Sequence, residues 1–407
     1  MNRRDFLWLT TAPALLPVGR GALASTAGDA PKRLIVILLR GAVDGLNIVV
    51  PYAERAYYDA RQTIAIGPPG GDGGALPLDS HFGLHPALLR LIPLWTDKKL
   101  AFVHAAGSKD PTRSHFDAQL FMENGTPGRK TTPDGWMNRL LAELPAPHGP
   151  TDALSIGVTL PQILKGKLPV ANLPLGPQAS RAMPLDRAEI GQAFDRLYAR
   201  DDAISEAYRE GRAARAELIG DLPSETHQAD NGAPPPNSFP AQAARLAYLL
   251  VKDRRIRLAF ASLGGWDTHV NQGSKTGQLA RHLGLLGDGA AALAKGLGKD
   301  FDDTVIVVIS EFGRTVHENG NGGTDHGHGN VIWVLGGRVR GGQVLGDWPG
   351  LAAKQLYQGR DLAVTTDFRL VLATILERHL GLRGEQLDRI FPGMPPARSG
   401  IEQILAV

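Results

Sequence analysis

The sequence predicts an α/β fold with a mostly parallel central sheet covered by helices on both faces. Short apolar runs rich in β-branched residues alternate along the chain with longer segments of helical periodicity. Most of these runs are continuously apolar, which is typical of parallel strands buried on both faces. Strands that alternate with helices place one helical layer on each side of the sheet, so we expect a three-layer α/β/α sandwich.

The first strand is expected at Arg33–Leu39, whose residues are all apolar after the arginine. Further apolar runs predict strands at 100–104, 154–158, 256–263, 304–309 and 331–335. Helical spacing of apolar residues predicts helices at 85–95, 114–123, 241–252, 278–297 and 368–380. The 114–123 helix is followed by Asn-Gly, a common helix stop signal.

The first 24 residues predict an export signal that is not part of the fold. Arg3 and Arg4 precede an apolar stretch at 6–18, and residues 22–24 form the small-residue cleavage site Ala-Leu-Ala. We expect export by the twin-arginine machinery, with the remaining domain at 25–407 in the periplasm or outside the cell. The apolar stretch is short and contains two prolines, so no permanent membrane span is expected.

Residues 183–240 interrupt the regular alternation. The segment 185–218 is polar and charged with helical periodicity, and it predicts a helical insertion outside the sheet. The segment 224–240 is rich in proline and polar residues, a composition typical of a flexible linker. We therefore expect one α/β domain with an insertion and linker at about 183–240.

Charge and cysteine content exclude several function classes. The chain has 44 Lys and Arg against 41 Asp and Glu, and no basic run stands out, so nucleic-acid binding is not expected. The absence of cysteine rules out disulfides, thiolate catalysis and a lipid anchor on cysteine.

A glycine-rich loop directly after the 304–309 run concentrates ionisable side chains, namely Glu311, Arg314, Asp325, His326 and His328. Ligand sites of open α/β sheets lie beyond the carboxyl ends of the strands, and carboxylates and imidazoles bind metals or transfer protons. The alternative is a solvated loop whose acidic and amide residues form turns. His326 is the better ligand candidate of the two histidines because Gly327 allows close approach.

A second group follows the 256–263 run. Asp267 and His269 are two residues apart, so in an extended segment their side chains lie on the same side and can share one cation. One Asp-x-His is weak evidence. Its combination with an Asp-His pair after another strand favours a metal site.

Three further positions have a functional and a structural interpretation. Asp44 follows the first strand and is either a cation ligand or part of an Asp-Gly turn. Ser114 opens a helix and is either a nucleophile, with Arg113 holding an oxyanion, or a cap paired with Asp117. Glu311 and Arg314 are either a ligand and an anion-binding group or an ion pair. The second-choice site residues are His115, Asp325 and His328.

These motifs, taken in order, resemble the DUF1501 family of exported bacterial proteins. The resemblance rests on the twin-arginine signal and on residues 39–47, 111–116, 264–269, 310–315 and 323–327. This family is related to the alkaline phosphatase and sulfatase superfamily. The resemblance implies an alkaline phosphatase-like α/β/α sandwich with metals at the carboxyl edge of the sheet.

The resemblance also implies roles for individual residues. Asp44 takes the place of the first metal-ligand aspartate and Ser114 that of the nucleophile. One metal would be bound by Asp267, His269 and His326, and the acidic ligand of a second metal would be Glu311. Phe312 follows Glu311 where the superfamily pattern has a histidine, so one divalent metal is expected more than two, with zinc, manganese and calcium as candidates.

The leading functional hypothesis is an exported metal-dependent hydrolase of phosphate or sulfate esters. Ser114 or a water at the metal would attack, and Arg113 and Arg314 would neutralise the anionic transition state. The substrate would be a small anionic ester or a cell-surface polymer. The rival hypothesis is a catalytically degenerate relative that acts as a periplasmic binding or cell-surface protein.

Overall fold

The computed structural model describes residues 31–157, 159–173, 229–396 and 401–405, together with positions 196, 199 and 205. The expected export signal and most of the expected insertion at 183–240 lie outside these residues. Within the described part of the chain, no helix is long and apolar enough to cross a membrane.

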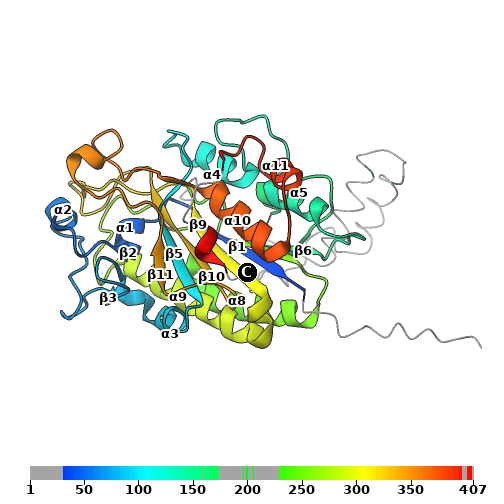
Figure 1. Cartoon of the computed structure of the whole chain (residues 1–407), viewed down its shortest axis with the longest axis horizontal. Helices are drawn as coiled ribbons and strands as arrows, with labels where there is room; N and C mark the ends of the chain where they lie inside the picture. Colours follow the sequence, from blue (N-terminus) through cyan, green and yellow to red (C-terminus); the bar gives the residue numbers. More distant parts are fainter. Residues whose placement is uncertain are drawn as a thin grey trace, which may run out of the picture. The chain divides into compact units, whose positions relative to one another are not determined.

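A nine-stranded sheet forms the centre of the fold (Figure 1). Its members are β1 (Arg33–Leu39), β5 (Leu100–Gly107), β6 (Ala153–Ile156), β7 (Ala171–Leu173), β8 (Leu258–Leu263), β9 (Thr304–Ser310), β10 (Asn330–Gly336), β11 (Gln343–Leu345) and β12 (Thr366–Asp367). The strand order is β11-β5-β10-β9-β1-β8-β6-β7, and β12 also pairs with β5. Only β10 among these strands pairs antiparallel, with β5 and with β9. The prediction of a mostly parallel sheet is therefore confirmed.

Strand β1 lies inside the sheet because its continuous apolar sequence suits a position covered on both faces. Every residue of β1 is buried, and β1 pairs in parallel with β8 on one side and β9 on the other. Ile35 and Ile37 belong to one apolar cluster, whereas Leu34 and Val36 belong to another. Successive side chains of a strand point to opposite faces, so the sheet separates two cores.

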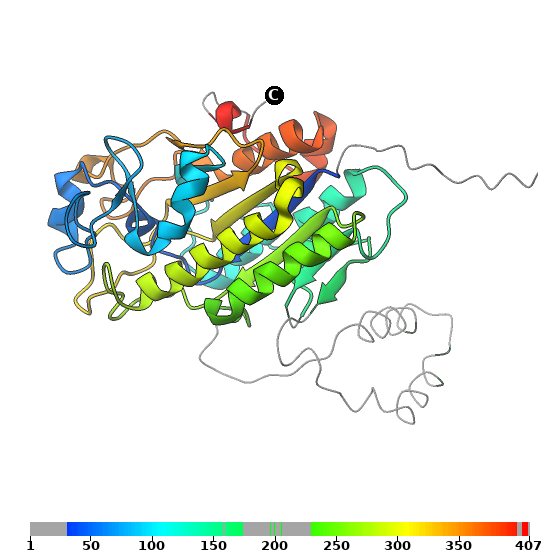
Figure 2. The same ribbon diagram turned by 90° about the horizontal axis from the view of Figure 1, so that it is seen from below.

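Two helical layers cover these cores (Figure 2). One core contains residues of the 3₁₀ segment η1 (Pro86–Leu91) and of α3 (Ile92–Thr96), α8 (Phe239–Lys252) and α9 (Gln278–Leu297). The other contains residues of α4 (His115–Asn124), α5 (Trp136–Glu143), α10 (Phe368–Leu380) and α11 (Glu385–Ile390). Figure 2 shows the green and yellow helices α8 and α9 side by side on one face and the orange helix α10 on the other. The expected three-layer arrangement is confirmed.

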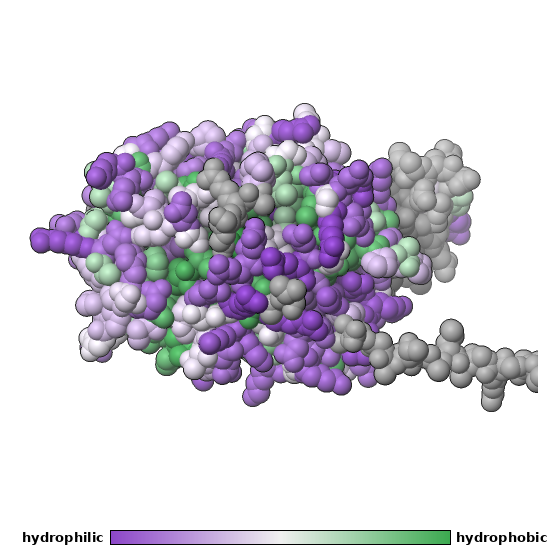
Figure 3. Space-filling model, viewed as in Figure 1, coloured by the Kyte–Doolittle hydropathy of each residue, from purple (hydrophilic) through white to green (hydrophobic). Residues whose placement is uncertain are grey.

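Shorter elements complete the described fold. A small antiparallel sheet consists of β2 (Val49–Val50), β4 (Gly83–Leu84) and β3 (Leu76–Pro77). The short helices are α1 (Gly45–Ile48), α2 (Arg55–Ala60), η2 (Gln162–Leu164), η5 (Pro236–Ser238), η6 (Gly298–Asp303), η7 (Ala353–Gln355) and η8 (Glu402–Ile404). On the face drawn in Figure 3, hydrophilic residues prevail and apolar ones form small separate patches, as expected when apolar side chains fill two internal cores.

The structure differs from the sequence prediction in two instructive places. The expected helix at 85–95 is a 3₁₀ segment followed by α3, because Pro93 lacks an N–H and is accommodated only in the first turn of a new helix. Strand β10 follows β9 after a long loop and returns antiparallel beside it. Apolar composition alone does not determine strand direction, so this reversal was not predicted.

Part of the expected linker packs against the sheet. The Asp230 carboxylate accepts a hydrogen bond from the Gly265 N–H at 2.7 Å, and the Gly264 N–H donates to the Pro234 carbonyl at 2.9 Å. These contacts place residues 230–234 beside the loop that follows β8.

Candidate metal centre

The carboxyl ends of three strands bring the candidate ligands together. Helix α4 follows β5 and begins with His115, the loop after β8 carries Asp267 and His269, and the loop after β9 carries His326. These three strands point in the same direction, so their following loops meet at one edge of the sheet.

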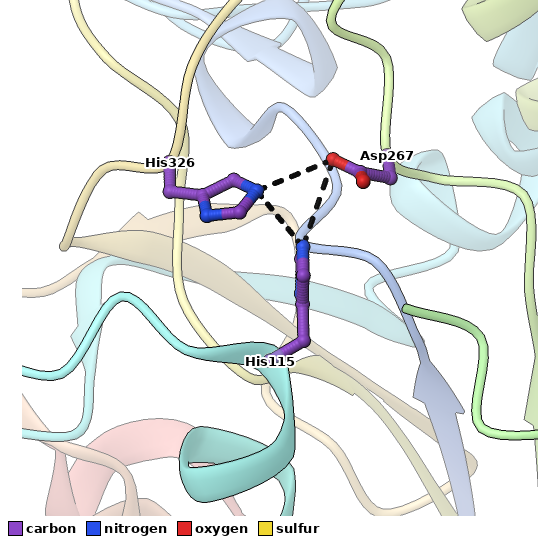
Figure 4. A group of neighbouring side chains, drawn as sticks. All are labelled: His115, Asp267 and His326. Carbon is purple, nitrogen blue, oxygen red and sulfur yellow. Dashed lines mark hydrogen bonds and ion pairs between the residues drawn. The ribbon is translucent and has the colours of Figure 1, made fainter. Parts of the chain in front are cut away.

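Four polar atoms of these residues lie close together, and Figure 4 shows three of the residues, His115, Asp267 and His326. His326 Nε2 lies 2.9 Å from the Nε2 atoms of both His115 and His269. Asp267 Oδ1 lies 3.6 Å from His115 Nε2, 3.0 Å from His269 Nε2 and 3.4 Å from His326 Nε2. Three imidazoles and one carboxylate therefore share a single small volume.

The second ring nitrogen of each histidine already has a partner. Nδ1 of His115 is 2.9 Å from Glu311 Oε1, Nδ1 of His269 is 3.1 Å from Asp325 Oδ1, and Nδ1 of His326 is 2.9 Å from the Arg113 carbonyl oxygen. All three partners are acceptors, so each neutral imidazole carries its hydrogen on Nδ1 and leaves a lone pair on Nε2. The lone pairs of His115 and His269 each face that of His326, and a cation between them relieves this repulsion.

The spacing and chemistry of the four atoms fit a divalent metal. A tetrahedral zinc ion bound at roughly 2.0–2.1 Å separates neighbouring ligand atoms by about 3.3 Å. Five of the six separations, all except that between His115 and His269, are 2.9–3.6 Å and bracket this value. Metal-bound histidines commonly donate their other N–H to a carboxylate or a backbone carbonyl, which is the pattern seen here.

The electrostatics of the site favour bound positive charge. Burial lowers the pKa of His115, but hydrogen bonds with Asp267 and Glu311 outweigh this effect and raise the pKa to about 9. Burial raises the pKa of Asp267, yet His115, His326 and Arg314 together hold it well below its usual range. The same centre thus keeps a carboxylate ionised and attracts a proton to an imidazole.

Glu311 lies behind His115 and not among the converging atoms. Its Oε1 atom accepts hydrogen bonds from the Gly41 N–H at 2.8 Å and from Gln119 Nε2 at 2.9 Å, besides its contact with His115. Burial raises the pKa of Glu311, and the hydrogen bond and charge of His115 with the hydrogen bond from Gln119 lower it below the ordinary value. The structure therefore places Glu311 as the group that orients His115.

Phe312 stands at the position where the resemblance implies a histidine. Its ring is buried and stacks on His115, with ring centroids 5.0 Å apart, and it lies 5.3 Å from the His326 ring. An aromatic ring supplies no strong metal ligand, so one side of the centre is closed by apolar packing.

Asp44 lies apart from the converging atoms. Its Oδ2 atom accepts hydrogen bonds from Arg61 at 2.6 Å and from Gln272 at 2.7 Å, and the whole side chain is buried. Burying an ion pair satisfies both charges only when the partners stay together. Arg61 thus neutralises the charge of Asp44, the residue that the resemblance implies as the first metal-ligand aspartate.

Arg314 is a buried structural cation. Its guanidinium donates to Asp267 Oδ1 at 2.5 Å and to the carbonyl oxygens of Gly41, Ala42, Trp266 and Thr324. Only 1% of the residue is exposed, so it contacts no substrate from solvent. It fixes the Asp267 carboxylate between two strand-exit loops, and the alternative ion pair with Glu311 does not form.

Ser114 is the N-cap of α4 and is exposed to solvent. Its hydroxyl oxygen accepts a hydrogen bond from the Asp117 N–H at 3.5 Å, a long contact for a cap. The serine precedes His115 directly, so it stands beside the converging ligands at the positive end of a ten-residue helix.

Two arginines flank His326. Arg113 Nη2 lies 2.7 Å from Asp361 Oδ2, and Arg360 Nε lies 2.9 Å from the other oxygen of the same buried carboxylate. Arg360 also donates to the His326 carbonyl oxygen, and Arg113 supplies the carbonyl that contacts His326 Nδ1. These two cations share the Asp361 carboxylate, and the Asp325 carboxylate also interacts with Arg360. Arg360 belongs to no motif, so the sequence offered no signal for it.

The three second-choice site residues lie in different places relative to the candidate metal centre. His115 lies at the centre, a position that its place in the 111–116 motif made accessible to sequence reasoning. Asp325 orients His269 from the rim. His328 lies outside the cluster, with its ring stacked on Tyr357 at 4.3 Å.

At two positions beside the candidate metal centre, the close approach of two backbone segments requires glycine. Gly41 has φ +108°, and a Cβ atom there would lie 2.8 Å from the Asp267 nitrogen. A Cβ atom at Gly327 would lie 2.4 Å from the Arg314 carbonyl carbon, where Arg314 and His326 form an isolated β-bridge. Both positions bring separate loops into contact at the centre.

Fold and cluster together define an α/β/α protein with a candidate His₃Asp metal centre at the carboxyl edge of its sheet. The chain belongs to the DUF1501 family, described as a protein of unknown function, whose model matches residues 31–391. The family prediction is therefore confirmed. No curated protein matches the chain in sequence.

Several solved structures are similar to the chain. The zinc complex of the C-terminal periplasmic domain of EcEptC from Escherichia coli shares 13% identity over 76% of this chain and 74% of that chain, with a TM-score of 0.35. Alkaline phosphatase from the Antarctic bacterium TAB5 shares 12% identity over 75% and 91%, with a TM-score of 0.34. Ps i-CgsB in complex with k-i-k-neocarrahexaose shares 11% identity over 88% and 74%, with a TM-score of 0.38.

Proposed function

We propose that this protein is an exported, metal-dependent hydrolase of phosphate or sulfate esters that works with one divalent metal. The observation that supports this most is the approach of the His115, His269 and His326 Nε2 atoms to the Asp267 carboxylate. We assign His115, Asp267, His269 and His326 as the ligands. Asp44 and Glu311 are left out of the ligand set because neither lies in the group of converging ligand atoms, although Asp44 Oδ1 has no hydrogen-bond partner among the described residues.

The donor set favours zinc over the other candidate metals. Three imidazole nitrogens and one carboxylate oxygen suit zinc, whereas calcium prefers six to eight oxygen ligands. Manganese also favours oxygen donors. A divalent cation held here supplies Lewis-acid chemistry, which polarises an ester oxygen and favours an ionised hydroxyl.

The charge around the site suits an anionic ester. Asp267 is the only carboxylate among the proposed ligands, so a divalent cation keeps net positive charge. Arg113 and Arg360, held by Asp361, add positive charge beside His326 and are partly exposed, at 29% and 45% of their side chains. Arginine binds phosphate and sulfate groups through its planar set of N–H donors. We assign these two residues, and not Arg314, to substrate binding.

Ser114 is the proposed nucleophile. It is exposed, and its capping hydrogen bond is long enough to be exchanged for contact with a substrate. The N-terminus of α4 favours negative charge on an attacking or departing oxygen near this residue. Arg113, one residue earlier, would stabilise the charge that develops on the ester during attack.

A metal and activity assay tests this proposal. Purified full-length protein is expected to hold about one equivalent of metal by mass spectrometry and to cleave p-nitrophenyl phosphate, bis-p-nitrophenyl phosphate or p-nitrophenyl sulfate. His326→Ala is expected to lose both metal and activity. His317→Ala, an exposed histidine of the same loop, is the matched control and should keep both.

A binding protein of the same fold is the second candidate, and one observation favours it. The Asp44–Arg61 ion pair and the Phe312 ring stand at positions where the resemblance implies metal ligands, which supports a centre with fewer metals. One equivalent of metal with no cleavage of any ester probe would favour this candidate. Absence of metal after incubation with zinc or manganese would contradict the hydrolase proposal.

A further inference from the structure

A cavity of about 170 Å³ opens at the same edge of the sheet, beside β6 and β8 and apart from the four proposed metal ligands. Arg40 lies just after β1, Ser155 lies on β6 and Ser262 lies on β8, and all three line the cavity. Its other walls come from the loop that carries Thr159 and Lys165 and from residues 231–234. The carboxyl edge of an open α/β sheet is where such proteins bind ligands.

Two buried polar groups of this cavity lack hydrogen-bond partners. Arg40 is 3% exposed and Ser155 is 1% exposed, and neither Arg40 Nε nor Ser155 Oγ has a partner among the described residues. An unmet buried polar atom costs roughly 1–3 kcal/mol. A polar ligand in the cavity would relieve that cost, reaching the hydroxyl directly or after rotation of the Ser155 side chain.

The Arg40 guanidinium is held in position for such a ligand. Its Nη1 atom donates to Gln119 Oε1 at 2.6 Å, and its Nη2 atom donates to Glu123 Oε1 at 2.8 Å. These two bonds fix the plane of the guanidinium and use two of its five N–H donors, and Nε is its one nitrogen without a hydrogen-bond partner among the described residues. A donor fixed in this way loses little conformational entropy when a ligand binds.

The charge of the lining selects an anion. The described residues around the cavity include two cations, Arg40 and Lys165, and no carboxylate. Glu123 offsets part of the Arg40 charge from outside the cavity, whereas Lys165 is exposed and has no ion pair with the described residues. Thr159 and Ser262 add hydroxyl donors. The cavity is smaller than the roughly 300–1,000 Å³ typical of sites for drug-sized ligands.

We propose that this cavity binds a small oxyanion, either a free inorganic anion or a small molecule with a carboxylate, sulfate or phosphate group. Ser155 and the Arg40 Nε–H form its inner end, and Lys165 stands at its entrance. This site uses none of the proposed metal ligands, so it is independent of the proposed hydrolase activity.

Equilibrium dialysis of the full chain with radiolabelled sulfate or phosphate, and separately with radiolabelled acetate, tests the proposal. Saturable binding of about one equivalent of at least one of these anions is expected. Ser155→Val removes the hydroxyl and fills the space beside it, so it should weaken binding at least about tenfold. Lys165→Ala should weaken binding roughly threefold, as expected for loss of one exposed charge.

Lys167→Ala is the matched control, because Lys167 is an exposed lysine of the same loop that does not line the cavity. Thermal unfolding checks that Ser155→Val folds, and the surface variant Lys165→Ala remains decisive if it does not. No saturable binding of any of the three anions would overturn the proposal. Binding that survives both Ser155→Val and Lys165→Ala would place the anion elsewhere, such as at the metal centre, and would also overturn it.

Discussion

The Nε2 atoms of His115 and His326 lie 2.9 Å apart, although 211 residues separate them along the chain. Each imidazole uses Nδ1 for an acceptor, Glu311 in one case and the Arg113 carbonyl in the other. Two neutral rings in this arrangement would oppose lone pair to lone pair. The contact is stable only with a cation between the nitrogens, either a proton or a metal ion.

Metal affinity should therefore depend on pH. In the metal-free protein the pKa of His115 is raised to about 9, so a metal must displace a proton at neutral pH. We expect the apparent association constant for zinc to rise about tenfold per pH unit between about pH 7 and pH 9 and to level off above. Competition with a chromophoric chelator measures this constant. An affinity that is constant over this range would contradict the prediction.

The same shift affects the metal-free protein in the opposite direction. A folded pKa above the ordinary value of 6.5 contributes stability that is fully present below about pH 6.5. That contribution is lost as the pH rises through about 9. His115→Gln should remove both the stability change and the rise in metal affinity over this interval.

Arg314 and Arg113 should respond differently to replacement by leucine. Arg314→Leu leaves Asp267 and several carbonyl oxygens without their buried donor, so the free energy of unfolding should fall by about 3–5 kcal/mol. Arg113→Leu changes a partly exposed side chain and should cost about 1 kcal/mol or less. Urea unfolding measures both values.

The activity of Arg113→Leu tests its role in substrate binding separately from its effect on stability. Arg113→Leu should reduce kcat/KM for a cleaved ester by roughly 100-fold while keeping the fold, as expected for loss of a group that stabilises charge in the transition state. Unchanged kcat/KM in Arg113→Leu would remove this residue from the substrate-binding set.

Ser114 can be tested as nucleophile and as cap with two substitutions. Ser114→Ala should lower the free energy of unfolding by about 1 kcal/mol through loss of the cap, whereas Ser114→Asp should keep the cap and the stability. Both should lose ester cleavage because neither has a hydroxyl. Activity that persists in Ser114→Ala would exclude a covalent intermediate and assign the attack to water.

Gly41 and Gly70 form a matched pair for backbone strain. Both have positive φ, at +108° and +92°, but a Cβ atom at Gly41 would contact the Asp267 nitrogen at 2.8 Å and one at Gly70 would meet nothing within 4 Å. Gly70→Ala should cost about 1 kcal/mol from φ alone. Gly41→Ala should cost more and also lower metal affinity by shifting Asp267, as chelator competition would show. Equal effects of the two substitutions would contradict the role given to Gly41.

The sequence determined the architecture because that information is local. The apolar run of β1 indicates a buried strand, and the periodicity of α9 indicates a helix with one buried face. The sandwich could therefore be predicted from such patterns alone. The Asp-x-His motif marked Asp267 and His269 for the same reason, since residues two apart in an extended segment share a side.

Tertiary structure decided which charged groups meet. Asp44 and Glu311 are acidic residues at strand exits, yet one pairs with Arg61 and the other orients His115. His115 enters the centre only because the exit of β5 reaches those of β8 and β9. Partners of this kind depend on strand order and on the approach of loops that are distant in the sequence, such as Gly41 and Glu311, which are 270 residues apart. A pattern read along the chain contains neither, which is why the central place of His115 and the partners of Asp44 and Glu311 emerged only from the packed fold.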